Sequence, residues 1–129
     1  MSGASRDRES TVTPRPLRQE ERDVVLTLLK HSPSFALLSS MLDTIAVTDM
    51  NDGKMGSIKF LHRDDRDHCL GFELAKATYT DEDGILVSIA LNLDQYGELF
   101  ELDFWKVDFS SLIRYPRIDD LTVVAHASG

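Results

Sequence analysis

Hydrophobic residues near the start of the chain recur at the spacing of an α-helix, in which positions three and four residues apart share one face. Between Pro16 and Ser32 they form one stripe, made of Leu17, Val24, Val25, Leu28 and Leu29. A second, shorter stripe follows Pro33 and is made of Phe35, Leu38, Met41 and Leu42. Because only a short joint separates the two segments, they are predicted to form a helical hairpin.

From Thr44 onward hydrophobic residues alternate with polar ones, which is the period of a β-strand. Five segments carry this pattern: residues 44–50, 56–62, 70–80, 85–94 and 98–108. Since the links between them are short and rich in turn residues, an antiparallel meander is the simplest order. The predicted fold class is therefore α+β, with an N-terminal helical hairpin packed on an antiparallel sheet of about five strands in meander order.

The same pattern places one domain between two flanking segments. Residues 1–14 are small, polar and charged, so a disordered N-terminal arm is expected. Residues 15–116 hold the predicted elements and are expected to form a single α+β domain, since 129 residues suffice for one core. Residues 117–129 are predicted to be a C-terminal tail or an edge strand.

The last two predicted strands have a register that their pattern specifies. Setting Asp94 opposite Leu99 gives one apolar face, in which Ile89 meets Phe104, Leu91 meets Leu102 and Leu93 meets Phe100. The other face then pairs Asn92 with Glu101, Ala90 with Asp103 and Ser88 with Trp105. A slip by one residue would mix polar with apolar side chains on both faces, so this register is preferred.

The hairpin before it can be aligned in the same way. With a tight Asp83-Gly84 turn, Thr78 lies beside Ile89 and Leu74 beside Leu93. Tyr79 then shares the second face with Trp105, over a floor of small residues: Ala75, Ala77, Ser88 and Ala90. A face covered by a helix or by the C-terminal tail, with Trp105 as ordinary packing, explains this arrangement most simply, and aromatic residues rimmed by carboxylates also suit a binding surface for a basic protein. The predicted partner-binding residues are Tyr79, Asp94, Tyr96, Glu98, Glu101, Asp103 and Trp105.

Net charge changes the range of expected partners. The chain carries a formal charge of −8 and has a pI of about 4.8, so nucleic acid and anionic membrane surfaces are disfavoured and basic proteins are favoured. Cys69 is the only cysteine, which excludes an intrachain disulfide. With no apolar run of about 18 residues and no signal-like N-terminus, the expected location is cytoplasmic.

Two segments resemble metal sites. Residues 62–69, "HRDDRDHC", crowd together possible ligands, but their spacing fits no standard zinc pattern and two arginines offset the carboxylates. Residues 49–60 look like a calcium loop, yet they have Lys54 where glycine is needed and Phe60 where a bidentate glutamate is needed. A solvated loop and a turn explain them, so no metal and no cofactor are predicted.

Catalytic residues are equally hard to assign. Cys69 and His68 are neighbours, and neighbouring residues on a strand point to opposite faces. Glu101 and Asp103 share one strand face and could serve hydrolysis, but alternating charge on a solvated face explains them more simply. The chain is therefore not expected to be an enzyme.

Three segments resemble a small, uncharacterised bacterial family: "RPLRQEERDVVLTLL", "MGSIKF" and "DGILVSIALNLDQYGELFELDFWKVDFSSLI". Members often occur in toxin–immunity neighbourhoods and share an ending similar to "LNLD..GELFELD.WK.DFSPLI". The likeness spans roughly residues 15–116 and is strongest over 84–113. Ser111 stands where the family pattern has proline.

The resemblance implies an immunity protein that binds and neutralises a cognate, basic toxin, for example a nuclease. Under this interpretation Trp105 and Tyr79 are anchors, and carboxylates mimic phosphates and speed association. The alternative is a self-assembling or regulatory module, which predicts a homodimer.

Overall fold

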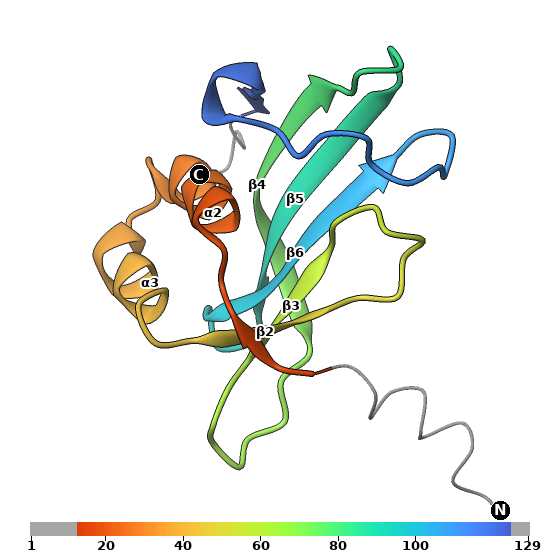
Figure 1. Ribbon diagram of the computed structural model, residues 1–129. Helices are drawn as coiled ribbons and strands as arrows, with labels where there is room; N and C mark the ends of the chain where they lie inside the picture. Colours follow the sequence, from red (N-terminus) through yellow and green to blue (C-terminus); the bar gives the residue numbers. More distant parts are fainter. Residues whose placement is uncertain (1–12, 125–129) are drawn as a thin grey trace, which may run out of the picture.

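The computed structural model describes residues 13–124 of the chain. These residues form one antiparallel sheet with two helices on one side of it (Figure 1). The strands are β1 (Arg15–Pro16), β2 (Ala46–Asp49), β3 (Ile58–Leu61), β4 (Leu70–Thr80), β5 (Leu86–Asp94), β6 (Leu99–Lys106) and β7 (Thr122–Val124). The helices are α2 (Gln19–Leu29) and α3 (Phe35–Met41), with a 3₁₀ turn η1 (Ile118–Asp120). Residues 1–12 of the predicted N-terminal arm lie outside this part of the chain.

The α+β class is confirmed, but the strand number and order differ from the prediction. Within residues 13–124 the sheet has seven strands in the order β1-β2-β3-β6-β5-β4-β7. Only β4, β5 and β6 follow one another as a meander, whereas β3 pairs with β6 instead of β4. Residues 62–69, when extended, reach about 25 Å, and crossing three strand spacings takes about 14 Å. The link between β3 and β4 is therefore long enough to cross the sheet, so these two strands need not be neighbours.

The helices are not an N-terminal hairpin as predicted, because β1 precedes them and pairs with β2. Arg15 fixes this arrangement through its guanidinium, which lies 2.8 Å from the buried Glu21 carboxylate and 2.7 Å from that of Asp49. The two helices are thus inserted between neighbouring strands. Neither helix within residues 13–124 is long and apolar enough to cross a membrane.

The hydrophobic core lies between the helices and one face of the sheet. The stripe predicted for the first helix is confirmed at its centre, where Val24, Val25, Leu28 and Leu29 are buried. In α3 the prediction holds for Leu38, whereas Phe35 is exposed. The sheet contributes alternate residues of β5 and β6, chiefly Val87, Ile89, Leu91, Leu102 and Phe104.

The register predicted for β5 and β6 is confirmed from Ser88–Trp105 to Asn92–Glu101. It is wrong at the turn, where Leu93 pairs with Leu99 and Phe100 is the extra residue of a bulge. The Asp94 amide donates to the Glu98 carbonyl at 2.8 Å, so the turn closes one residue earlier than the pattern suggested. Phe100 is buried but lies outside the main core cluster.

The register predicted for β4 and β5 is wrong by one residue. Ala77, not Thr78, lies opposite Ile89, and Tyr79 lies opposite Val87. The turn is longer than the predicted Asp83-Gly84 turn, because the Asp81 amide donates to the Ile85 carbonyl at 2.9 Å. A shift of one residue reverses every side chain of a strand. Ala75, Ala77 and Tyr79 therefore belong to the core.

The segment after β6 returns to the helix side of the sheet. The fully buried Lys106 is the last residue of β6, and its ammonium contacts Asp81 at 2.9 Å and Asp83 at 2.6 Å. Tyr115 then packs against Phe104 with ring centroids 5.2 Å apart. Residues 122–124 end as the edge strand β7 beside β4. In the part of β4 that precedes its pairing with β7, the register of β4 against β5 shifts twice, between Leu70 and Phe72 and between Glu73 and Ala75.

Candidate functional site

The face of the sheet away from the helices is the first candidate surface. Strand alternation and the observed pairings assign to this outer face the residues Lys59, Lys76, Thr78, Ser88, Ala90, Asn92, Glu101, Asp103 and Trp105. Because the helices and the core cluster lie on the other face, the interpretation in which a helix covers this one is not supported within residues 13–124.

Trp105 is the largest exposed feature of the outer face. Its side chain is 49% exposed although both chain neighbours, Phe104 and Lys106, are buried. Phe109 is 69% exposed, and its ring centroid lies 6.1 Å from that of Trp105. Leu86 and Val107 are exposed beside them, joined by a backbone hydrogen bond of 3.0 Å. We call these four side chains the Trp105 patch.

Phe109 reaches this position through an unusual backbone conformation. Its φ is +64°, in the left-handed region that bulky residues rarely adopt. The carboxylate of Asp108 stabilises the turn by accepting hydrogen bonds from the Ser110 amide at 3.0 Å and the Ser110 hydroxyl at 2.6 Å. Residues in such sparsely populated backbone conformations cluster at active sites, ligand clamps and switch regions, so this turn is a candidate part of a binding surface.

The carboxylates of the outer face are spread along β6. Glu101 accepts a hydrogen bond from the side-chain amide of Asn92 at 3.0 Å, and Asp103 accepts one from the Ser57 hydroxyl at 3.2 Å. Burial raises the pKa of Asp103. The hydrogen bond from Ser57 lowers this pKa, and charge repulsion by Asp52 raises it further. Lys59 and Lys76 lie on the same face, so it is less acidic than the sequence suggested.

The seven predicted partner-binding residues do not form one site. Tyr79 is buried in the core and its hydroxyl donates to the Arg114 carbonyl at 3.0 Å. It therefore lies on the opposite face from Trp105. Glu101, Asp103 and Trp105 do share a strand face. Asp94, Tyr96 and Glu98 lie at the β5–β6 turn, roughly 20 Å from Trp105 by the rise of a strand.

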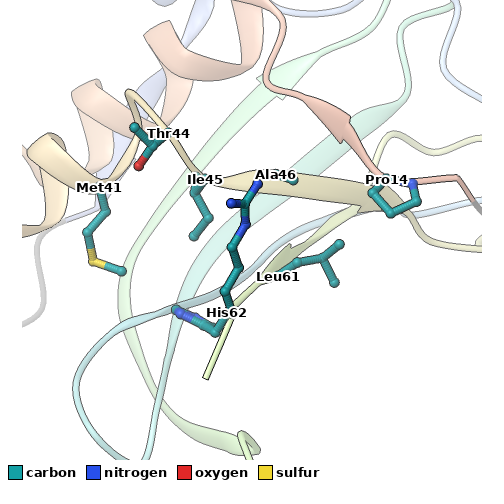
Figure 2. Close-up of a pocket in the computed structure, with 8 residues that line it drawn as sticks. Pro14, Met41, Thr44, Ile45, Ala46, Leu61 and His62 are labelled. Atoms are coloured by element: carbon teal, nitrogen blue, oxygen red, sulfur yellow. The ribbon is translucent and has the colours of Figure 1, made fainter. Parts of the chain in front are cut away.

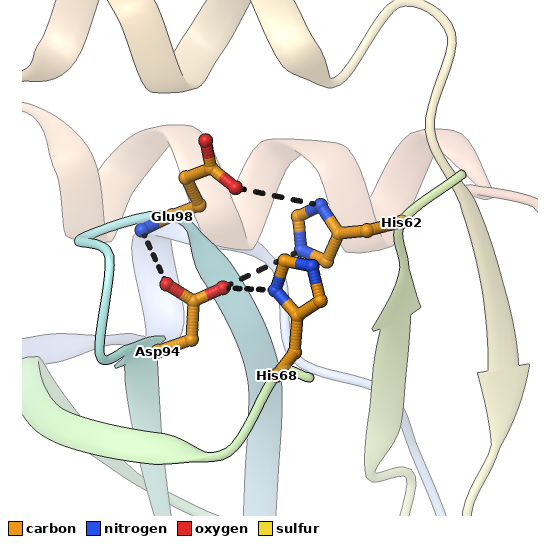
Figure 3. A group of neighbouring side chains, drawn as sticks. All are labelled: His62, His68, Asp94 and Glu98. Carbon is orange, nitrogen blue, oxygen red and sulfur yellow. Dashed lines mark hydrogen bonds and ion pairs between the residues drawn. The ribbon is translucent and has the colours of Figure 1, made fainter. Parts of the chain in front are cut away.

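A second candidate site lies at that turn and was not predicted. His62, His68, Asp94 and Glu98 each offer one nitrogen or oxygen atom, and all four atoms lie within 4.8 Å of one another (Figure 3). We call this group the histidine–carboxylate cluster. The crossing loop of residues 62–69 supplies both histidines, and the β5–β6 turn supplies both carboxylates.

His68 lies between two carboxylates. Its Nδ1 is 2.7 Å from Asp94 Oδ2 and its Nε2 is 2.7 Å from Asp64 Oδ1. Since neither carboxylate can donate a proton, both nitrogens carry one when these bonds form. The bonds to Asp94 and then Asp64 raise the pKa of His68.

Asp94 is the most buried member of the cluster, with a side chain that is 0% exposed. Burial alone would raise the pKa of this carboxyl, but hydrogen bonds from His68 and from the backbone amides of Glu98 and Tyr96 lower it. Both amides bind Oδ1 at 2.9 Å. The other oxygen, Oδ2, therefore points toward the histidines.

His62 and Glu98 complete the cluster. His62 Nε2 lies 2.6 Å from the Leu99 carbonyl oxygen, so this nitrogen is the donor and Nδ1 is left facing Glu98 Oε1 at 3.8 Å. The rings of His62 and His68 stack with centroids 4.2 Å apart. Arg66 binds Glu98 at 2.7 Å and lies over the Tyr96 ring at 4.2 Å. Tyr96 thus packs over the cluster and not over the outer face.

An open pocket of about 630 Å³ adjoins the cluster through His62 (Figure 2). It lies between the end of α3 and the strands β2 and β3. Its lining is mixed: Pro14, Met41, Thr44, Ile45, Ala46, Leu61, His62 and Arg63. Few polar groups converge in it, so the pocket by itself indicates no reaction.

The sequence pattern predicts a solvated loop for residues 63–68. The only sign of the cluster in the sequence is the pair of histidines six positions apart, His62 and His68. The four side chains come from the ends of four strands, and only the pairing of β3 with β6, which sends residues 62–69 across the sheet to β4, brings them together. The arrangement of these four side chains does not test the prediction that no metal is bound.

No curated protein and no solved structure matches the chain significantly. A family model described as a domain of unknown function, DUF6984, matches residues 14–116. This agrees with the resemblance to an uncharacterised family, while the toxin–immunity association has no support from the match. Because the match covers most of the chain, the protein belongs to the DUF6984 family.

Proposed function

We propose that the protein is a non-catalytic binding module that docks a basic protein partner on its outer face. The observation that carries the proposal is the Trp105 patch, in which a half-exposed tryptophan lies beside a strongly exposed phenylalanine on a sheet face. Exposed apolar clusters rimmed by polar residues mark interaction sites, and tryptophan is enriched among residues that dominate binding energy.

The sheet supports the patch as a rigid platform. Trp105 pairs with Ser88 near one end of β5 and β6, two inner strands of the sheet, and the next residues on either side of Trp105 are buried. A partner therefore meets a surface whose backbone needs little ordering on binding, which reduces the entropic cost of association.

Charge favours a basic partner. The chain has a formal charge of −8, and Glu101, Asp103 and Asp108 lie on or beside β6 near the patch. Opposite charge steers encounter and raises the association rate more than it raises affinity. Lys59 and Lys76 limit this contribution, so the patch is expected to supply most of the binding energy.

The resemblance extends the proposal to neutralisation of a cognate toxin. In that role the outer face covers the active cleft of the toxin, and no chemistry by this chain is required. This finer assignment rests on the resemblance, whereas the docking surface rests on the exposed residues of β6.

The test uses a toxin candidate encoded beside the gene, produced in cells together with this chain or its variants. Wild-type protein is expected to restore growth and to bind the purified toxin. Trp105→Ala should weaken the measured affinity at least about 30-fold, because a hot-spot residue contributes about 2 kcal/mol or more. Retained affinity in a folded Trp105→Ala variant excludes the patch as the docking site.

Two double variants, each lacking two negative charges, distinguish the effect of charge on the outer face from the effect of the overall net charge. Glu101→Gln with Asp103→Asn keeps the hydrogen-bond acceptors and removes two charges from the outer face. Asp65→Asn with Asp119→Asn removes the same charge from exposed positions in the crossing loop and in η1. The first pair should slow association and reduce its salt dependence, and the second pair should change both much less.

Self-association on the same face is a distinct outcome. It would appear as a concentration-dependent dimer in sedimentation experiments, which Trp105→Ala dissociates without any toxin present. That result would replace the basic partner with a second copy of this chain.

A further inference from the structure

We propose that the histidine–carboxylate cluster binds one divalent transition-metal ion, preferentially Zn²⁺. His62, His68, Asp94 and Glu98 each offer one ligand atom, and the proposed atoms are His62 Nδ1, His68 Nδ1, Asp94 Oδ2 and Glu98 Oε1. His62 Nε2 also lies 3.8 Å from Asp94 Oδ2, but it is engaged by the Leu99 carbonyl at 2.6 Å, so Nδ1 is the nitrogen of His62 left for a metal. Imidazole and carboxylate ligands in a set of four suit the tetrahedral preference of zinc. This inference concerns a site separate from the Trp105 patch and does not depend on it.

Both histidines are oriented for coordination through Nδ1. The Nε2 atom of His62 donates to the Leu99 carbonyl at 2.6 Å, and that of His68 donates to the Asp64 carboxylate at 2.7 Å. Histidine ligands of metals almost always donate their second nitrogen to a carbonyl or carboxylate in this way. The outer contacts of a metal site are thus in place on both rings.

The carboxylates are oriented by the rest of the turn. The two backbone amides that bind Asp94 Oδ1 leave Oδ2 directed at His68 Nδ1, 2.7 Å away. Arg66 holds Glu98 Oε1 on the other side of the cluster, 3.8 Å from His62 Nδ1. Two carboxylates balance the charge of a divalent ion in a partly buried position.

Completing the site requires the side chains to move, chiefly the two histidine rings, which stack nearly parallel. Ligand atoms around tetrahedral zinc lie about 3.4 Å apart, given bonds of about 2.0–2.2 Å. The separations of two of the ligand pairs, 2.7 and 3.8 Å, lie on either side of that value, and all four atoms lie within 4.8 Å of one another. A metal lies in the plane of each imidazole that binds it, so the parallel stack of His62 and His68 must tilt apart. The ion replaces the proton on His68 Nδ1, which leaves to solvent.

A filled site would connect the ends of β3, β4, β5 and β6. It would fix the crossing loop of residues 62–69 to the β5–β6 turn. Four protein ligands leave no open position, which is the arrangement of structural and not of catalytic zinc. The expected role is therefore to stabilise the crossing connection.

The test is a calorimetric titration of chelator-treated full-length protein with ZnCl₂. A Cys69→Ser background removes the exposed thiol next to His68, which could otherwise contribute a ligand. One ion per chain should bind, and the unfolding temperature should rise with zinc concentration. His62→Gln and Glu98→Gln should each weaken binding at least tenfold. His31→Gln, which changes an exposed histidine outside the cluster, should not.

Glu98 is partly exposed, so its variant keeps the test decisive even if substitution of a histidine prevents folding. No saturable uptake of zinc by wild-type protein overturns the proposal. Equal affinities in the Glu98→Gln and His31→Gln variants also overturn it.

Nitrogen NMR of the histidine rings tests the ligand assignment itself. Upon addition of zinc, the Nδ1 resonances of His62 and His68 should shift to values of metal-bound nitrogen, while both Nε2 atoms keep their protons. Coordination through either Nε2 would contradict the proposed geometry. The Trp105→Ala variant should bind zinc as the wild type does, which separates this site from the docking surface.

Discussion

Replacement of Lys106 by methionine is expected to destabilise the fold by about 3 kcal/mol, since breaking one side of a buried ion pair costs about 3–5 kcal/mol. The Lys106 side chain is 0% exposed, and its ammonium donates to Asp81 at 2.9 Å, to Asp83 at 2.6 Å and to the Ser111 carbonyl at 3.1 Å. Methionine keeps the apolar stem in place and removes the charge.

The expected cost lies at the low end of that range because Asp81 keeps other partners. Its carboxylate also accepts hydrogen bonds from the backbone amides of Ile113, Arg114 and Glu82. Asp83 is partly exposed, so water can replace the lost ammonium there. The charge left without a cation is therefore the carboxylate of Asp81, which keeps its three backbone hydrogen bonds.

Urea unfolding followed by circular dichroism measures the effect, with Lys76→Met on the outer face as the matched control. The control should change the unfolding free energy by no more than about 0.5 kcal/mol, as surface substitutions usually do. In a double-mutant cycle, Lys106→Met with Asp81→Asn should be at least about 1 kcal/mol more stable than the sum of the single effects. A loss below about 1 kcal/mol, or strict additivity, would refute the ion pair as a stabilising contact.

Three further substitutions or conditions test separate parts of the fold. Hydrogen bonds from the Ile113 amide and from Lys106 outweigh burial and lower the pKa of Asp81 from 3.8 to about 2. Its contribution is therefore complete above pH 4 and lost as the pH falls toward 2, which unfolding free energies of wild type and Asp81→Asn should show. Ser57→Ala should cost about 1–3 kcal/mol in urea unfolding, because the buried Phe104 amide loses its acceptor at 2.8 Å. Gly71→Ala should lower the melting temperature, since a Cβ there would overlap the Asp94 carbonyl.

Local patterns predicted those parts of the molecule in which neighbours in sequence are neighbours in space. The apolar stripe of α2 and the pairing of β5 with β6 both follow from the period of side chains along one short segment. Even so, a bulge at Phe100 escaped prediction, because the extra residue depends on how the Asp94 carboxylate binds the turn amides.

Turn length and strand order were not available from such patterns. A hairpin turn that closes from Asp81 to Ile85 instead of at Asp83-Gly84 moves Tyr79 into the core and removes the predicted aromatic pair. The histidine–carboxylate cluster depends on β3 pairing with β6, so that the chain crosses the sheet from β3 to β4, and no local signal specifies this pairing. The sequence pattern therefore placed Trp105 correctly on one strand face with Glu101 and Asp103, left open whether that face is covered, and could not assemble the four residues of the cluster.

The two outermost strands also bear on how the protein behaves at high concentration. Within residues 13–124, β1 has two residues, one of them a proline without an amide donor, and β7 has three. The part of β4 beyond β7 is interrupted by two bulges. Short, bulged or proline-containing edges are poor templates for an incoming strand. Fibril growth by edge-to-edge addition is thereby hindered, and the protein can display exposed aromatic side chains on a face without exposing a long, regular edge.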